Sequence, residues 1–128
     1  MYNDNYANFF ELNGKTIKRI SGAYDDNDSV TIETDDGTYN LVHQQDCCES
    51  VNIIKVFGDP NDFVNQKVVL AEEDAGAAVP DWFDHNIWCG GGTLTHYSLV
   101  AENGSKLDIW WNGVSNGYYS ESVTCFKV

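Results

Sequence analysis

The chain has 128 residues, with 20 Asp and Glu against 7 Lys and Arg, a formal net charge of −13 and 42% hydrophobic residues. The apolar content excludes an acidic disordered tail, and the length indicates a single domain over residues 1–128. Direct binding to DNA, RNA or an anionic membrane is disfavoured, because a chain this acidic would be repelled by each of them.

The N-terminal residues lack the basic and apolar regions of a secretory signal, and no stretch approaches the roughly 18 apolar residues of a membrane span. We therefore expect a cytoplasmic protein. Four cysteines are too few for a disulfide scaffold in a chain of this length. Cys47 and Cys48 are adjacent and poorly placed to bridge to each other, so we expect all four cysteines to be reduced.

Short alternating runs bounded by Gly, Asn and Asp recur along the chain, whereas helical periodicity is hard to find. In the run 29–34, Val30 and Ile32 would point inward and the residues between them outward. The turn 35–37 would join this run to the next as a hairpin, because Asp and Gly tolerate a positive φ. In this half of the chain, strands are predicted at Thr16–Ala23, Ser29–Thr34, Thr38–His43, Val51–Phe57 and Val68–Ala71.

The segment 51–57 carries apolar residues on both faces, which favours a central position in a sheet. A short helical turn is expected around Phe63. Residues 72–74 then lead into an irregular exposed loop at Ala75–Pro80. In the last third of the chain, strands are predicted at Leu94–Ala101, Leu107–Trp111 and Val123–Lys127.

These elements predict a mainly β fold, with an α+β fold as the alternative. We expect a single antiparallel, strongly twisted sheet, or a small sandwich or barrel-like domain, with at most one or two short helices. The order of strand, polar turn, strand, polar loop and Glu-Ser-Val occurs twice, with the tripeptide at 49–51 and again at 121–123. Internal duplication and chance convergence both account for this pattern.

The segment 43–49 contains every side-chain type that a zinc or iron site uses. If a metal bound there, its ligands would be His43, Asp46, Cys47 and Cys48. The spacing lacks the ligand pairs of a structural zinc site, and His85, Cys89 and His96 could complete a site only if the fold converged them. We therefore expect no metal and no cofactor, with the adjacent cysteines facing opposite sides of a strand.

Cys47, His43 and Asp46 are also the residue types of a cysteine nucleophile with its base and orienting acid. Residues four apart on a strand lie about 13 Å apart, so only a turn would bring them together. His43 shares a face with Tyr39 and Leu41, and this position is more typical of a hydrogen-bonded histidine at a strand end. We expect no catalytic residue.

Carbohydrate binding or cleavage is a further alternative, because acids combined with tryptophans are typical of such sites. The residues concerned would be the acids at 72–74, Asp81 and Asp84 and the stacking residues Trp82, Trp88, Trp110 and Trp111. Since Trp110 and Trp111 are adjacent on a strand, one should lie in the core and the other at the surface. The glycines 90–92 lack the following Lys-Ser/Thr of a phosphate loop and are read as a plain turn.

The loop 112–120 combines two Asn-Gly turns with the adjacent residues Tyr118 and Tyr119. Tyrosines on a loop suit protein recognition, since they bring a large contact area at little entropic cost. The alternative is a long hairpin loop whose tyrosines fold back onto the sheet.

Two unusual segments of the chain resemble a family of small proteins of unknown function found mainly in bacteriophages and prophages. They are His43-x-Gln45-Asp46-Cys47-Cys48-Glu49-Ser50-Val51 and Trp111-x-Gly113-x-Ser115-Asn116-Gly117-Tyr118-Tyr119-Ser120-Glu121. The middle section, with Gly58-Asp59, Asp62-Phe63 and Ala71-Glu72-Glu73, is also similar, so that the resemblance spans residues 16–124. It transfers no activity or catalytic residue. It implies a phage-encoded protein that acts in the cytoplasm of the bacterial host.

From the charge and this resemblance we expect a non-enzymatic inhibitor of a host defence or nucleic-acid-handling protein, such as a CRISPR effector. Its acidic face would mimic nucleic acid and bind a basic host protein, as a monomer or homodimer. The alternative is a small ligand-, metal- or carbohydrate-binding domain, or a hydrolase, centred on residues 43–49. A third alternative is a structural or assembly protein that self-associates through its tyrosines and edge strands.

The charge is concentrated in one part of the sequence, since residues 25–84 hold 15 of the 20 acidic residues but only two of the seven basic ones. This distribution predicts a directional acidic face rather than a uniform coat. The predicted partner-binding residues are Asp25, Asp26, Asp28, Asp35, Asp36, Glu72, Glu73, Asp74, Tyr118 and Tyr119.

Overall fold

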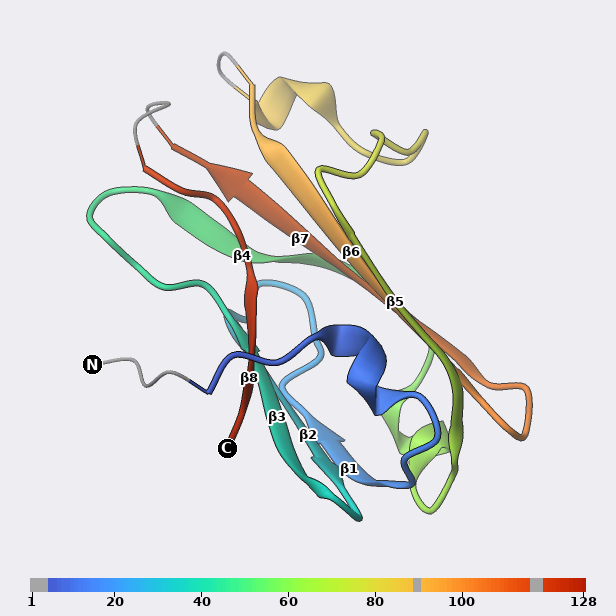
Figure 1. The fold of residues 1–128 in the computed structure, drawn as a ribbon. Helices are drawn as coiled ribbons and strands as arrows, with labels where there is room; N and C mark the ends of the chain where they lie inside the picture. The colour runs from blue at the N-terminus through green and yellow to red at the C-terminus, as the bar shows by residue number, and fades with distance from the viewer. Residues whose placement is uncertain (1–4, 89–90, 116–118) are drawn as a thin grey trace.

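The computed structural model describes residues 5–88, 91–115 and 119–128 and confirms the mainly β fold (Figure 1). Its strands form two antiparallel sheets of four strands each, which do not close into a barrel. The first sheet has the order β1-β2-β3-β8, with β1 at Ile17–Ser21, β2 at Ser29–Thr34, β3 at Gly37–Val42 and β8 at Thr124–Lys127. The second has the order β4-β7-β6-β5, with β4 at Ser50–Phe57, β7 at Lys106–Val114, β6 at Thr93–Ala101 and β5 at Val68–Ala75.

Helical structure in the described ranges is limited to short 3-10 turns. These are η1 at Phe9–Leu12, η2 at Pro60–Phe63 and η3 at His85–Ile87. In η1, Asn8 and Glu11 form a reciprocal capping box, which explains why the turn starts there. In η2, the short helical turn expected around Phe63, the Asp59 carboxylate accepts the N–H of Asn61 and Phe63 is buried. No helix in these ranges is long and apolar enough to span a membrane.

One hydrophobic core is shared by the two sheets and the first two turns. Val30 and Ile32 are fully buried within it, so the predicted alternation of β2 is confirmed. Trp111 is fully buried while Trp110 is not, which confirms that these adjacent tryptophans face opposite sides of β7. Removal of such apolar surface from water is the main term that stabilises the fold.

Two strand predictions were wrong, and β7 also continues to Val114, three residues into the loop predicted at 112–120. β4 is an edge strand of its sheet and not a central one. Its outer edge is covered by the β1–β2 loop, because Asp26 donates its N–H to the Ile53 carbonyl and Ile53 donates to the Asn27 carbonyl, both at 2.8 Å. β5 continues to Ala75, so residues 72–74 belong to a strand rather than leading into a loop. Pairing with β6 along this whole length outweighs the low β propensity of Asp and Glu.

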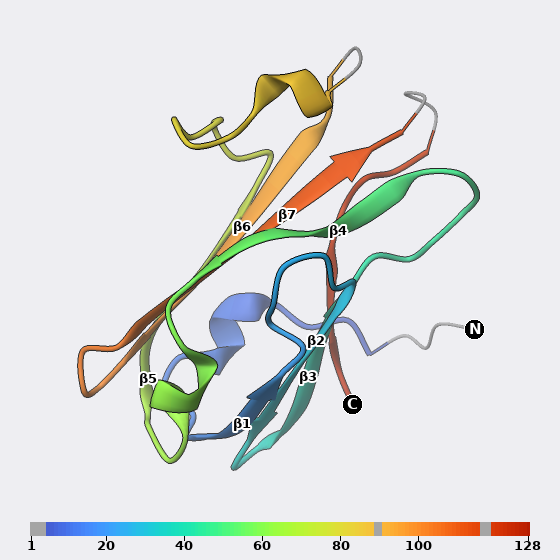
Figure 2. The same cartoon turned by 180° about the vertical axis from the view of Figure 1, so that it is seen from behind.

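The two halves of the chain exchange their last strands (Figures 1 and 2). After β3 the chain crosses to the second sheet, where β4 pairs with β7. After β7 it crosses back, and β8 pairs with β3. The strands β1-β2-β3-β4 and β5-β6-β7-β8 therefore follow the same path in opposite sheets. This reciprocal topology supports an internal repeat over chance convergence.

Candidate functional site

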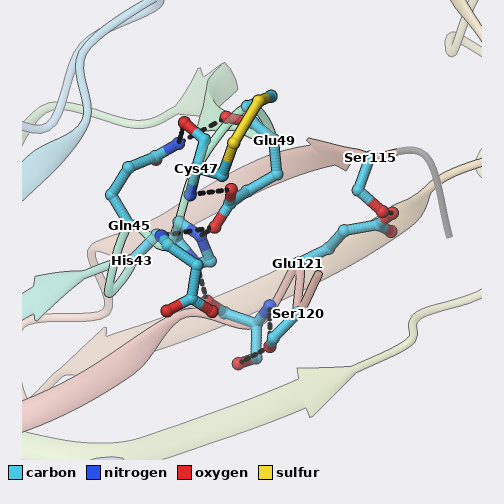
Figure 3. A network of polar contacts seen from close by, with 10 residues as sticks. His43, Gln45, Cys47, Glu49, Ser115, Ser120 and Glu121 are labelled. Carbon is cyan, nitrogen blue, oxygen red and sulfur yellow. Dashed lines mark hydrogen bonds and ion pairs between the residues drawn. A yellow bond between two sulfur atoms is a disulfide. The ribbon is translucent and has the colours of Figure 1, made fainter. Parts of the chain in front are cut away.

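The crossover from β3 to β4, residues 43–49, folds around the carboxylate of Glu49 (Figure 3). Glu49 Oε2 accepts hydrogen bonds from the Asp46 N–H at 2.8 Å and from His43 Nε2 at 2.7 Å, while Oε1 accepts from the Cys47 N–H at 2.9 Å. Burial raises the pKa of Glu49, but these donors outweigh it and lower the pKa to about 2. The carboxylate is therefore ionised at neutral pH.

His43 links this crossover to the second one, which runs from β7 to β8. Its Nδ1 donates to the carbonyl oxygen of Ser122 at 2.6 Å, while Nε2 contacts Glu49. A carbonyl oxygen and an ionised carboxylate are both hydrogen-bond acceptors, so each ring nitrogen of His43 contacts an acceptor. His43 is 6% exposed, and it is the hydrogen-bonded histidine at a strand end that the sequence predicted.

The two adjacent cysteines contradict the prediction of four reduced thiols, since Cys47 and Cys48 are joined by a disulfide bond. They lie in a turn and not on a strand, because the loop bends around Glu49 and places both side chains on its exposed outer side. Cys125 is a buried free thiol, and burial raises its pKa to about 12. Cys89 lies outside the described residues.

The predicted ligand and catalytic types in this segment do not assemble into a reactive site. Both ring nitrogens of His43 are engaged, so His43 has no nitrogen left to serve Cys47 as a base. Asp46 is exposed, and its backbone N–H rather than its carboxylate contributes to the network. Among the residues that the structure describes, no three His, Cys, Asp or Glu side chains converge on a point that could hold a metal.

The second crossover has a carboxylate at the corresponding place. Glu121 accepts a hydrogen bond from Thr93 Oγ1 at 2.7 Å and another from Ser115 Oγ at 2.5 Å. Ser115 follows the last residue of β7 as His43 follows the last residue of β3, and in both crossovers the glutamate comes six residues later. Tyr119 is half-buried, and Tyr118 lies outside the described residues.

The predicted acidic partner-binding residues are exposed, but they fall in three separate places. Asp25, Asp26 and Asp28 lie in the β1–β2 loop, Asp35 and Asp36 in the β2–β3 turn, and Glu72, Glu73 and Asp74 on β5. The β1–β2 loop and the β2–β3 turn are at opposite ends of β2, and β5 belongs to the other sheet. The clustering in the sequence is therefore divided among three surface groups.

Asp36 is the member of this set that pairs with cations. Its carboxylate is 2.6 Å from Lys15 Nζ and 3.8 Å from Lys127 Nζ. The hydrogen bond from Lys15 and the charge of Lys127 hold the pKa of Asp36 below its usual value. This turn is consequently the least available of the three groups to an outside cation.

The β5 group faces polar side chains of β6 and β7, of which sequence reasoning considered His96 but missed Ser98 and Asp108. Glu72 lies opposite Ser98 on β6, and Asp74 lies opposite His96. Across the next ladder Ser98 is opposite Asp108 on β7. Alternation on β6 and β7 could have shown that these residues share a face, but their neighbours across strands depend on a register that the sequence does not reveal.

Of the residues considered for carbohydrate binding, Trp82 and Trp110 lie on the same face of the second sheet as Glu72 and Asp74, but not all of the others join them there. Trp111 is in the core, and the Trp88 indole N–H donates to Asn112 Oδ1 at 2.7 Å. Trp82 packs edge-on against Trp110, with ring centroids 5.4 Å apart. Asp81 and Asp84 are exposed, and Asp84 accepts the backbone N–H of Asn86.

No curated protein and no solved structure matches this chain. A family model does match it, over residues 11–125, which include both crossovers and all eight strands but for the end of β8. That match covers most of the chain. The protein therefore belongs to the family described as Domain of unknown function (DUF7448).

Proposed function

We propose that this protein is a non-enzymatic inhibitor encoded by a bacteriophage, which acts in the host cytoplasm by binding a basic, nucleic-acid-handling host protein. Its carboxylates take the place of the phosphates that the partner normally binds. The two crossovers hold the fold together, and the exposed carboxylates of the β1–β2 loop and β5 make the contacts.

The observation that carries this proposal is the lack of counter-cations at the exposed carboxylates. Within the described part of the chain, the ion pairs of carboxylates involve Glu33, Asp36, Glu49 and Asp108. None of the acids in the β1–β2 loop or on β5 forms one in that part. These side chains face water with their charge uncompensated, so a basic partner gains favourable electrostatic energy on approach.

The separation of the acidic groups favours a partner with an extended basic surface. The β1–β2 loop lies against β4, and β5 is at the opposite edge of the same sheet, so a partner contacting both would have to reach across that sheet. A channel that normally holds a nucleic acid offers such a surface, because it is lined with cations over many nucleotides. The resemblance of residues 16–124 to phage proteins supports the same kind of target, a component of host defence.

Affinity capture from bacterial lysate tests this function. We expect the tagged chain to retain basic, nucleic-acid-binding proteins at low salt, and duplex DNA added as a competitor should release them. The variant Glu72→Gln/Asp74→Asn/Asp26→Asn/Asp28→Asn removes four uncompensated charges from exposed positions and should retain much less of the same proteins.

A matched variant controls for net charge alone. Asp81→Asn/Asp84→Asn/Glu102→Gln/Asp62→Asn also removes four exposed carboxylates, but from outside the proposed contact groups, and should retain most of the captured material. If the retained proteins are no more basic than the lysate, or if DNA does not displace them, the proposed function is wrong.

A further inference from the structure

The outer face of the second sheet contains a cavity of about 380 Å³ beside the acidic residues of β5. Its walls come from β5, β6 and β7, and it is lined by Glu72, Glu73, Asp74, His96, Ser98 and Lys106. We call these six residues and Asp108 the β5–β7 pocket. The pocket lies on the surface where one of the acidic groups meets the polar residues of β6 and β7.

The antiparallel register places the pocket side chains in two neighbouring rows. One row contains Glu72, Ser98 and Asp108, and the next contains Asp74, His96 and Trp110. Because directly opposite side chains on a sheet lie within about 5.5 Å of each other at Cβ, each carboxylate of β5 is within reach of the centre of its row. The β5 carboxylates therefore face a fixed wall formed by β6 and β7.

That wall is held rigidly by contacts of its own. His96 Nε2 is 2.7 Å from Asp108 Oδ1, and the His96 ring stacks on Trp110 with centroids 4.0 Å apart and an interplanar angle of 6°. Trp82 packs edge-on against the same indole. A wall fixed in this way loses little side-chain entropy when a ligand binds.

Ser98 supplies an independent sign of a ligand. It is 7% exposed and lines the pocket, yet its hydroxyl has no hydrogen-bond partner among the described residues. The hydroxyl is not one of the fully buried, unpartnered atoms of the described residues, which belong to Tyr39, Tyr97 and Trp111, so it opens to the pocket and is available to a bound group. It makes no hydrogen bond to His96 in the described structure, so a nucleophile–base pair is not assembled there.

The charge and size of the pocket define the occupant as an organic cation. Three carboxylates, from Glu72, Asp74 and Asp108, face one lysine, Lys106, whereas Glu73 lies opposite Tyr97 on the other face of β5. No three of these acids converge closely enough for a metal ion within the described residues. A guanidinium suits acceptors spread over two rows, because it presents five N–H donors in one plane and forms charge-assisted hydrogen bonds with carboxylates.

We infer that the β5–β7 pocket binds the guanidinium of one arginine side chain of the basic partner, anchored by Glu72, Asp74 and the Ser98 hydroxyl. This inference rests on the proposed function and names the chemistry of one contact within it. Carboxylates around a desolvated arginine form the type of contact that dominates binding at protein interfaces.

Lys106 is the cation of the protein that a guanidinium entering the pocket must compete with for Asp108. Its Nζ is 3.8 Å from Asp108 Oδ2, and its side chain is 60% exposed at the rim. A pair this open contributes little to folding. Removal of Lys106 should therefore strengthen binding of an outside cation without harming the fold.

Nuclear magnetic resonance titration of the full chain with Nα-acetyl-arginine amide tests the pocket directly. We expect saturable shifts of the backbone amides of His96, Ser98 and Asp108, with a Kd on the order of 1 mM for so small a ligand. The uncharged analogue Nα-acetyl-citrulline amide should not produce them. An arginine-containing peptide should shift the same amides and bind more tightly, since the partner and not a free metabolite is the source of the cation.

Three variants make this test specific. Glu72→Gln/Asp74→Asn should weaken binding about tenfold, and Lys106→Met should strengthen it about threefold. Asp26→Asn/Asp28→Asn removes as much charge from the β1–β2 loop and should leave the Kd within about twofold. Equal binding of the citrulline amide, or an equal loss in both double variants, would overturn the inference.

The outcome is separable from that of the proposed function. If basic host proteins are captured but arginine amide gives no saturable shifts in the pocket, the function stands and this anchor is wrong. If arginine amide binds the pocket but no basic protein is captured, the site stands and the assigned partner is wrong.

Discussion

Two histidine–carboxylate pairs have the same nitrogen–oxygen distance but differ in their surroundings. His43 and Glu49 at the first crossover, and His96 and Asp108 on the outer sheet face, are each 2.7 Å apart. The side chains of the first pair are 3% and 0% exposed, against 23% and 16% for the second. In the first pair the remaining hydrogen-bonding atoms are bound within the protein, whereas the second borders a cavity with unused acceptors.

The difference shows that residue types do not distinguish a structural polar cluster from a binding site. A buried pair with every group satisfied stabilises one arrangement of the chain, and here it joins the two crossovers. A partly exposed pair that lies beside carboxylates without ion pairs can accept a ligand. Changes at the first pair should therefore alter stability, and changes at the second should alter binding.

The largest expected effect is at Glu49. Glu49→Ala leaves the His43 ring and the N–H groups of Asp46 and Cys47 without their acceptor, and should lower the Tm by roughly 10 °C in thermal unfolding. Glu121→Ala, at the corresponding place in the second crossover, removes the acceptor of two hydroxyl groups in the described structure, and water can replace it, so its effect should be roughly half as large. Equal effects would show that burial does not separate the two crossovers.

Acid should destabilise the protein through the same carboxylate. The pKa of Glu49 is about 2 in the folded chain, against an ordinary value of 4.5 in the unfolded one. A lowered pKa means that this contribution is complete above pH 4.5 and is lost as the pH falls towards 2. Urea unfolding of the wild type and of Glu49→Gln across this range should show a shallower loss of stability in the variant. Parallel curves would contradict the assignment.

At the outer face of the second sheet, we expect substitutions to alter binding and to leave the stability nearly unchanged. Glu72→Gln/Asp74→Asn removes two exposed carboxylates without ion pairs in the described structure, so the free energy of unfolding should change by less than about 0.5 kcal/mol. Capture of the basic partner should nevertheless fall about tenfold. A folded variant with unchanged capture would remove β5 from the contact surface.

The smallest expected effect is at the disulfide. Cys47 and Cys48 are both exposed, and the hydrogen bond to Glu49 comes from the backbone of Cys47 and not from its sulfur. Cys47→Ser/Cys48→Ser should therefore change the free energy of unfolding by less than about 1 kcal/mol and leave capture unchanged. A loss as large as that of Glu49→Ala would show that the disulfide itself holds the loop.

Much of the fold could be predicted, because the alternation of apolar and polar residues along a strand indicates which side chains are buried. The strand 29–34 was predicted with its exact bounds, and Tyr39, Leu41 and His43 share the buried face expected for them. The position of β4 could not be predicted in this way. Its apolar residues are covered by the β1–β2 loop and the shared core, and sequence alternation does not distinguish such cover from a neighbouring strand.

The candidate site was harder to predict, because its residues meet across strands. Residues 43–49 were considered for metal binding and catalysis because they contain many reactive side-chain types. In the structure, groups of this segment hydrogen-bond to one another. His96 and Asp108 are 12 residues apart and come together only through the register of β6 and β7. Likewise, 15 acids concentrated in residues 25–84 were expected to form one face, but those predicted to bind a partner lie at the two ends of β2 and on β5 of the other sheet.

The dependence of partner affinity on salt tests most directly the claim that uncompensated carboxylates carry the binding. For the captured partner, the logarithm of Kd should rise steeply with the logarithm of the salt concentration, and the slope should be shallower for Glu72→Gln/Asp74→Asn but unchanged for Cys47→Ser/Cys48→Ser. A Kd that does not vary with salt, or the same slope for all three proteins, would contradict the claim.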